Sequence, residues 1–203
     1  MTGYSMIILA GGKSSRMGTD KADLLLQGKT FLETQIAKGR ELGITDILVS
    51  GYHGKQCSAN VIPDRITAKG PLGGLEACLR AAKHPRALVL SVDVPLVPTA
   101  ELRDLIEYDS SMTDLFQKAY NEKDDVSVPK YVTILQNNGK EQPLIAVYDC
   151  SLADEMEQEI LTRKGSVFAF INRIGYRRYE SSAEAAYFEN INDQDTYQKY
   201  TFL

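Results

Sequence analysis

A short apolar run near the start of the chain, Met6-Ile7-Ile8-Leu9-Ala10, stops abruptly at Gly11-Gly12. A continuous apolar run of this length is typical of a β-strand that is buried on both faces. Such strands belong mainly to parallel sheets that helices cover on both sides. The run therefore predicts an interior strand of an α/β sheet, followed by a turn at the edge of that sheet.

Strand and helix patterns continue to alternate through the first half of the chain. Thr30 and Glu33 form a capping-box pattern at the start of a helix, whose register continues through Ile36, Gly39, Arg40 and Leu42 until Gly43. Further strands are expected at 47–49, 59–62 and 87–92, and further helices at 72–82 and 99–108. Strands separated by helices imply crossover connections and a mostly parallel sheet.

The second half of the chain departs from this alternation. An apolar segment at 131–135 is followed by Asn137-Asn138-Gly139 and a second apolar segment at 143–148, which is typical of a hairpin. Helices are expected at 151–163, 166–172 and 193–200, with a strand at 176–179. We therefore predict an α/β fold with a mostly parallel sheet and a small antiparallel excursion in the second half.

Length and composition limit the classes of protein that fit. The 203 residues are enough for one good core but short for two, so a single domain over 1–203 is expected. A net charge of −4 without a basic block argues against a nucleic-acid-binding surface. Cys57, Cys78 and Cys150 form no paired pattern, which favours a reducing, cytoplasmic compartment. The apolar run at 6–10 is too short to span a bilayer, so no membrane partner is expected.

The string from Leu9 to Lys21 contains the strongest chemical pattern. Gly11 and Gly12 allow the backbone to approach a ligand closely, and Arg16 and Lys21 add two cations, a combination that suits a triphosphate. It is not a P-loop, because the earlier glycine would fall at a strand position, and it lacks the third glycine of a dinucleotide fingerprint. A plain turn with a solvated charged face is the alternative.

Ser91-Val92-Asp93-Val94-Pro95 follows another predicted buried strand. A carboxylate at the carboxyl end of a strand can hold a hard cation such as Mg²⁺, which prefers oxygen ligands. Asp93 is therefore a candidate metal ligand that could link the ion to a triphosphate. A simple cap of the following turn is the alternative role.

Three weaker patterns add polar groups. Pro63-Asp64 precedes Gly70-Pro71-Leu72-Gly73-Gly74, a glycine-rich turn that opens a helix. Glu141-Gln142-Pro143-Leu144 and Asn190-Ile191-Asn192 lie in the second half. The two asparagines, two positions apart, would share one side of an extended segment and could bind a pterin or a phosphate, or they could cap the last helix. His53 and His84 lie in no ligand pattern.

The Leu9 to Lys21 string resembles the opening loop of the sugar-nucleotide and cofactor nucleotidyltransferases, a Rossmann-like, three-layer family. The later segments resemble its molybdenum cofactor guanylyltransferase branch, so the resemblance extends from Ile7 to Asn192. It implies Mg²⁺ as cofactor, GTP and molybdopterin as substrates, a nucleotide-binding half at about 1–110 and an acceptor-binding half at about 111–203. The resemblance also implies transient contact with proteins that deliver or accept the cofactor.

The resemblance assigns a role to each candidate residue. Arg16, Lys21 and Asp93 would be catalytic, with Asp93 as the metal ligand. The residues expected to bind the nucleotide are Leu9, Ala10, Gly11, Gly12, Arg16, Lys21, Ser50, Asp64, Gly73 and Asp93, and those expected to bind the acceptor are Gln142, Pro143, Asn190 and Asn192.

One residue departs from the guanylyltransferase pattern. Ser50 occupies a position where that branch often carries an asparagine near the nucleotide. Two alternatives keep the chemistry: CTP with the same pterin, or a sugar or alcohol phosphate as acceptor. A third, of another class, is a regulatory protein that binds a nucleotide without catalysis. The combination of Arg16, Lys21 and Asp93 argues against it, because nucleotide retention alone needs no metal-holding carboxylate.

Overall fold

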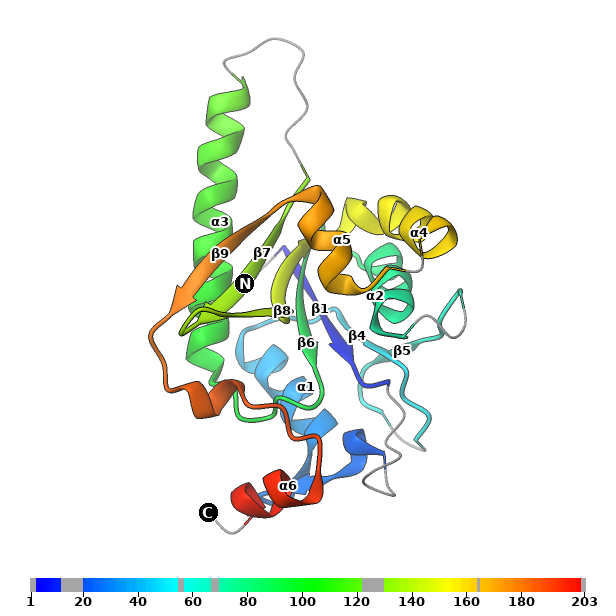
Figure 1. The fold of residues 1–203 in the computed structure, drawn as a ribbon, viewed down its shortest axis with the longest axis vertical. Helices are drawn as coiled ribbons and strands as arrows, with labels where there is room; N and C mark the ends of the chain where they lie inside the picture. Colours follow the sequence, from blue (N-terminus) through cyan, green and yellow to red (C-terminus); the bar gives the residue numbers. More distant parts are fainter. Residues whose placement is uncertain are drawn as a thin grey trace.

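A seven-stranded sheet runs through the computed structural model, in the order β5-β4-β1-β6-β8-β7-β9 (Figure 1). The structure describes residues 3–11, 20–54, 57–66, 70–121, 130–163 and 165–201. The strands are β1 (Tyr4–Leu9), β4 (Ile47–Ser50), β5 (Asn60–Ile62), β6 (Arg86–Ser91), β7 (Val132–Asn137), β8 (Lys140–Asp149) and β9 (Tyr176–Ser181). A separate small sheet pairs β2 (Leu25–Leu26) with β3 (Lys29–Thr30).

The direction of the strands matches the predicted fold class. β1 pairs in parallel with β4 and β6, and β4 pairs in parallel with β5. β8 runs antiparallel to both of its neighbours, β6 and β7, whereas β7 and β9 are parallel. The mostly parallel sheet with an antiparallel excursion in the second half is confirmed.

Helices cover both faces of the large sheet (Figure 1). One face carries α1 (Phe31–Glu41) and α3 (Thr99–Asn121), and the other carries α2 (Gly70–Ala81), α4 (Ala153–Thr162) and α5 (Val167–Ile174). Short helices η1 (Lys21–Asp23), η2 (Cys150–Leu152) and η3 (Ala185–Phe188) and the last helix, α6 (Gln194–Thr201), complete the described elements. Within these residues, no helix is both long enough and apolar enough to cross a bilayer.

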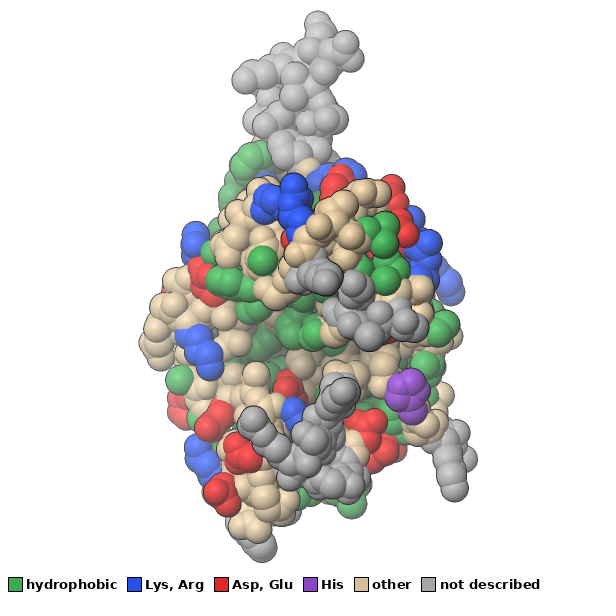
Figure 2. Space-filling model, turned by 45° about the vertical axis from the view of Figure 1, so that its right-hand side comes forward, with side chains coloured by type: hydrophobic (Ala, Val, Ile, Leu, Met, Phe, Trp, Pro, Cys, Tyr) green, Lys and Arg blue, Asp and Glu red, His purple; other side chains and the backbone are tan. Residues whose placement is uncertain are grey.

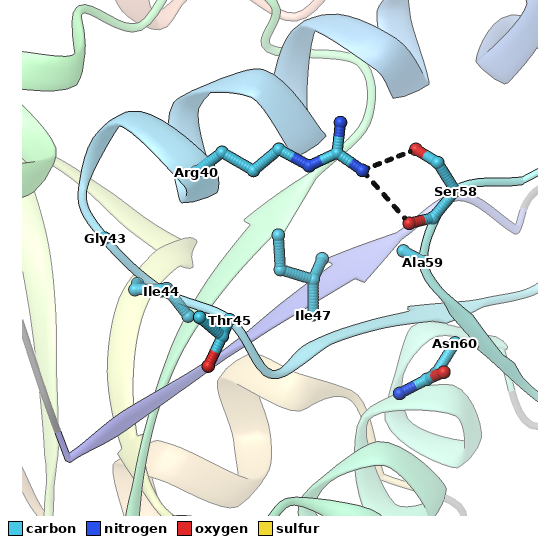
Figure 3. A pocket seen from close by; sticks show the side chains of 8 residues that line it. All are labelled: Arg40, Gly43, Ile44, Thr45, Ile47, Ser58, Ala59 and Asn60. Carbon is cyan, nitrogen blue, oxygen red and sulfur yellow. Dashed lines mark hydrogen bonds between the residues drawn. The ribbon is translucent and has the colours of Figure 1, made fainter.

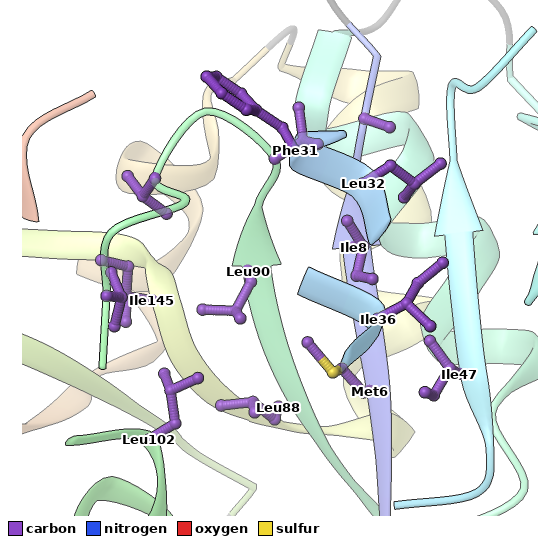
Figure 4. Close-up of a cluster of buried hydrophobic side chains, with 14 of the residues drawn as sticks. Met6, Ile8, Phe31, Leu32, Ile36, Ile47, Leu88, Leu90, Leu102 and Ile145 are labelled. Carbon is purple, nitrogen blue, oxygen red and sulfur yellow. The ribbon is translucent and has the colours of Figure 1, made fainter. Parts of the chain in front are cut away.

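Alternate residues of β1 enter the two halves of the core. Met6 and Ile8 pack with Ile36 of α1 on one face (Figure 4). Ile7 and Leu9 pack against α2 on the other face. All four β1 side chains are buried, so the predicted strand with two buried faces is confirmed. Its position inside the sheet brings its carboxyl end between those of β4 and β6.

The N-terminus of α1 has the predicted capping box. The Thr30 hydroxyl accepts from the Glu33 backbone N–H at 3.0 Å, and the Glu33 carboxylate accepts from the Thr30 N–H at 2.8 Å. Such caps stabilise a helix by about 1 kcal/mol. Of the residues named for the helical register, Ile36, Gly39 and Leu42 are buried and Arg40 is exposed, and Gln35 and Lys38 are buried as well.

Helix α3 continues to Asn121, beyond the expected end at Tyr108. The Asp109-Ser110-Ser111 sequence is unfavourable inside a helix because these side chains compete for backbone hydrogen bonds. Asp109 is nevertheless fully buried, and its carboxylate accepts from Nε of Arg86 at 3.0 Å and from Oγ1 of Thr133 at 2.7 Å. These tertiary contacts outweigh the local preference, and the expected end of the helix was wrong.

Candidate nucleotide and metal site

The ends of three parallel strands lie in register at one edge of the sheet. Leu9 of β1 is aligned with Ser50 of β4 on one side and with Ser91 of β6 on the other. The Ala10 N–H donates to the Ser50 carbonyl at 2.9 Å, and the Val92 N–H donates to the Leu9 carbonyl at 3.0 Å. Ligands of open α/β sheets bind at this edge, and the predicted patterns following β1, β4 and β6 meet there.

Lys21, Asp93 and Asn192 come together beyond this edge. Lys21 Nζ lies 3.5 Å from Asp93 Oδ2, and it also donates a hydrogen bond to Asn192 Oδ1. The Lys21 side chain is 22% exposed and the Asp93 side chain 15% exposed. A cation, a carboxylate and an amide that were each predicted from separate segments therefore form one partly exposed polar cluster.

Asp93 is held through both its side chain and its backbone. Ser91 Oγ donates to Asp93 Oδ1 at 2.5 Å, and the Ile191 N–H donates to the Asp93 carbonyl at 2.8 Å. Within the described residues, its hydrogen-bonding and ionic contacts are the hydroxyl of Ser91 and the ammonium of Lys21, not an N–H of the following turn. These contacts do not include the turn cap of the alternative reading, and the metal-binding role of Asp93 stays a prediction.

Asp93 has the chemistry that a magnesium site requires. Mg²⁺ binds hard oxygen ligands and commonly takes one or two carboxylates together with phosphate oxygens of a substrate. The described parts of the chain contain no group of three or more His, Cys, Asp or Glu residues that could hold a metal ion. Among the described residues, the donor set fits an ion that Asp93 would hold together with oxygens of a phosphorylated ligand.

Ser50 and Asp64 form a second polar pair at the same edge. Ser50 Oγ donates to Asp64 Oδ1 at 3.1 Å. A Cβ added to Gly74 would lie 2.0 Å from Ser50 Oγ and 3.3 Å from Asp64 Oδ1, so the absence of a side chain lets the first turns of α2 approach this pair. Gly73 is buried in the same turn, and its role toward the nucleotide stays a prediction.

Another glycine, Gly51, was missed by the sequence reasoning. Gly51 has φ of 75° and follows β4 directly, and a Cβ there would lie 2.3 Å from Gly11 Cα. Two glycines in contact explain how the backbones after β1 and β4 come so close. The sequence signal was the glycine after a predicted strand, which marks a turn or a close backbone approach.

Two predicted nucleotide-binding residues, Gly12 and Arg16, lie outside the described residues, as does Lys13. The expected roles of Gly12 and Arg16 therefore stay predictions. Leu9 and Ala10 are buried at the end of β1, and Gly11 follows them. These three residues supply backbone at the edge of the sheet.

The four residues expected to bind the acceptor do not all lie together. Asn192 belongs to the cluster with Lys21, whereas Asn190 is exposed. Gln142 is buried on β8 and lines a cavity of about 530 Å³ together with Asn137, Lys140, Ala185, Phe188 and Lys199. The Pro143 carbonyl accepts from the Tyr148 hydroxyl at 2.7 Å.

The capping alternative for the two asparagines is not what the structure shows. The Thr196 N–H donates to Asp193 Oδ1 at 2.8 Å at the start of α6. Asp193 therefore caps this helix, and Asn192 contacts Lys21 instead. The acceptor-binding role of Asn190 and Asn192 stays a prediction.

A further hollow lies at the opposite end of the strands, where β4 and β5 begin (Figure 3). Its volume is about 350 Å³, and Arg40 Nη2 crosses it to the Ser58 carbonyl at 3.2 Å and the Ser58 hydroxyl at 3.0 Å. None of the predicted site residues lines it.

On the face drawn in Figure 2, acidic and basic side chains are interspersed around a hollowed centre.

Comparison with known proteins identifies the family of the chain. The sequence profile of the MobA-like NTP transferase domain matches residues 6–174. A Carboxydothermus hydrogenoformans protein named probable molybdenum cofactor guanylyltransferase is 30% identical, over 98% of this chain and 95% of its own length.

Two solved structures show the same fold. The crystal structure of molybdopterin-guanine dinucleotide biosynthesis protein A from Archaeoglobus fulgidus has a TM-score of 0.73 at 22% identity, covering 98% of this chain and 97% of its own. A Mycobacterium tuberculosis protein solved in complex with manganese has a TM-score of 0.68 at 13% identity, covering 99% of each chain. With the profile covering most of its length, the chain belongs to the MobA-like NTP transferase family.

Proposed function

We propose that this protein transfers GMP from GTP to the terminal phosphate of molybdopterin, with release of pyrophosphate. The observation that carries the proposal is the meeting of Lys21 and Asp93, 3.5 Å apart, at the carboxyl ends of β1 and β6. A cation and a metal-binding carboxylate are what a triphosphate requires at such an edge. The name of the C. hydrogenoformans relative supports GTP and the molybdenum cofactor as substrates.

The reaction needs little covalent chemistry from the protein. A phosphate oxygen of molybdopterin forms the new bond to the α-phosphorus of GTP. The bond from that phosphorus to the oxygen that bridges it to the β-phosphorus breaks. The electron pair leaves with pyrophosphate. The attacking phosphate is already anionic near neutral pH, so no general base is required. Catalysis then depends on positioning and charge neutralisation.

The side chains have distinct tasks in this proposal. Lys21 and Arg16 would stabilise the negative charge that gathers on the leaving pyrophosphate. Asp93 would hold the magnesium ion. Ser91 Oγ would keep the Asp93 carboxylate in place through its 2.5 Å hydrogen bond to Asp93 Oδ1. The ion, when bound, neutralises phosphate charge. The manganese in the M. tuberculosis neighbour is consistent with a divalent metal.

The remaining assignments follow the same proposal. Ser50, Asp64 and the first turns of α2 would contact the nucleoside, in a nucleotide-binding half at about 1–110 of a single domain. Gln142, Pro143, Asn190 and Asn192 would lie on the acceptor side, at about 111–203. Cys57, Cys78 and Cys150 are free thiols, which supports a reducing compartment, the cytoplasm.

The experiment is pyrophosphate release from GTP and molybdopterin in the presence of magnesium. Asp93→Ala should lower turnover by about a hundredfold or more, because the charge that holds the ion is lost. Asp154→Ala is the control, since Asp154 is a carboxylate that is 79% exposed on α4. Turnover of Asp93→Ala within a few-fold of the unmodified protein would contradict the assignment.

A further inference from the structure

Two polar side chains of α1, Gln35 and Lys38, are buried directly beneath the segment that carries Asp93. Gln35 is completely buried and Lys38 is 8% exposed. Burying an amide or an ammonium is unfavourable unless each finds hydrogen-bond partners. Their partners therefore indicate why an otherwise apolar helix face keeps them.

Those partners are backbone carbonyls on both sides of Asp93. Gln35 Nε2 donates to the Ser91 carbonyl at 3.0 Å and to the Val94 carbonyl at 3.1 Å. Lys38 Nζ donates to the Pro95 carbonyl at 2.7 Å and to Gln35 Oε1 at 3.0 Å. The two side chains thus form one connected network that binds the chain before and after the carboxylate.

This network holds the Val94 and Pro95 backbone, which lies beyond the end of β6 and is not paired within the sheet. Beyond Ser91 the β6 ladder ends, so the carbonyls of Val94 and Pro95 need other donors when they are buried. Gln35 and Lys38 are three positions apart on one face of α1 and can reach adjacent turns of the loop. The same helix contacts the far end of the connection, since Thr99 Oγ1 donates to Glu41 Oε2 at 3.0 Å.

We infer that Gln35 and Lys38 are positioning residues that fix the Asp93 carboxylate for the metal-bound triphosphate, although neither touches that ligand. This inference rests on the proposed function, because it requires Asp93 to hold the ion. Groups that hydrogen-bond a metal ligand directly change metal affinity by about tenfold to a hundredfold when they are lost. Gln35 and Lys38 act one step further away, on the backbone on both sides of Asp93, so an effect near the lower end is expected. A merely structural role would change folding stability and leave metal coupling intact.

The test measures GTP binding calorimetrically with the full chain, without acceptor, once with excess Mg²⁺ and once with EDTA. The dissociation constant in EDTA divided by the dissociation constant with Mg²⁺ reports how much the metal strengthens GTP binding. Lys38→Met and Gln35→Met should each lower this ratio by about tenfold, while the dissociation constant in EDTA changes by less than about twofold. Gln35→Met keeps the length of the side chain, whereas Lys38→Met shortens it by one atom, and Gln35→Met decides alone if Lys38→Met does not fold.

Two controls separate the possible failures. Ile36→Val, in the core between the two positions and 3% exposed, weakens packing and should leave the ratio unchanged. Asp93→Ala should abolish the metal dependence. If Asp93→Ala loses the coupling while both methionine variants keep it, the inference is wrong and the proposed function stands. If Asp93→Ala also keeps it, the metal-holding role of Asp93 is wrong and the inference is overturned with it.

Discussion

Lys21 and Asn192 are 171 positions apart in the sequence, yet Lys21 Nζ donates a hydrogen bond to Asn192 Oδ1. Other contacts bring the C-terminal segment to the same region. The Tyr197 hydroxyl donates to the Leu25 carbonyl at 2.7 Å, and the rings of Tyr197 and Phe31 are 6.1 Å apart. The C-terminal segment thus packs against residues that follow the Leu9 to Lys21 string, and Asn192 contacts Lys21 in the candidate site.

Asn192→Ala should slow transfer by about tenfold to a hundredfold, because the Lys21 ammonium loses the amide that orients it, and small displacements of catalytic groups are costly. Steady-state pyrophosphate release measures the effect. Gln198→Ala is the matched control, since this amide on α6 is exposed and has no proposed role in the site. An equal loss in the two variants would contradict the importance of the contact between Asn192 and Lys21.

Lys21→Ala should weaken triphosphate binding and slow transfer more than Lys13→Ala does. Lys21 lies 3.5 Å from Asp93 at the edge of the sheet, and loss of a charge-stabilising donor in a transition state costs about a hundredfold or more. Lys13 belongs to a sequence that only imitates a P-loop. Rate and GTP affinity of both variants should be measured side by side, and a costlier loss at Lys13 would contradict the assignment.

Much of the fold could be predicted because local signals and tertiary packing agree there. The apolar run at 6–10 needs burial on both faces, and the Thr30 and Glu33 pair determines where α1 begins. Helix α3 shows the limit of such reasoning. Its continuation past Tyr108 depends on Asp109 meeting Arg86 and Thr133, two residues that lie on different strands and far away in the sequence.

Part of the arrangement of the candidate site could be predicted, whereas the roles of its residues stay predictions. Asp93 and Lys21 follow strands that the pattern identified, so the topology of a parallel sheet brings them to one edge. Gln35 and Lys38 were missed, because a polar residue on a predicted helix is normally assigned to solvent. Only their burial distinguishes them, and it depends on how α1 packs against the sheet and the segment after β6.

Asp109→Ala should lower the free energy of unfolding by about 3–5 kcal/mol, because it leaves the Arg86 guanidinium buried without its main partner. The Asp109 side chain is completely buried and that of Arg86 is 9% exposed. Glu155→Ala, which removes a carboxylate that is 41% exposed in its pair with Lys130, should cost less than about 1 kcal/mol. Urea unfolding measures both, and similar losses would contradict the importance of burial.

Lys38 should make stability depend on pH. Burial lowers the pKa of Lys38 from 10.5 to about 7, partly offset by Glu41. Between these values the unfolded chain binds the proton and the folded protein releases it, so the contribution of this lysine to stability rises with pH. Below about pH 7 both states are protonated, and the cost of the buried charge is present in full.

Lys38→Met removes this titration. From about pH 7 to about pH 10, the native protein should gain stability relative to the variant, by at most about 1.4 kcal/mol per pH unit. Urea unfolding across this range measures the difference. Lys83→Met is the control, because the Lys83 side chain is 72% exposed and its removal should give a difference that hardly changes with pH. A constant difference for Lys38→Met would contradict the lowered pKa.

Nucleotide choice is the most direct test of guanylyl transfer to a pterin. The purified protein is given molybdopterin, magnesium and equal concentrations of GTP and CTP labelled at the α-phosphate, and the labelled dinucleotide products are separated. A site that hydrogen-bonds the polar edge of guanine leaves its own groups unpaired with cytosine, so the guanine dinucleotide should exceed the cytosine dinucleotide by orders of magnitude. Equal or greater labelling from CTP would contradict guanylyl transfer, and no labelling of the pterin alongside good transfer to a sugar phosphate would contradict a role in cofactor synthesis.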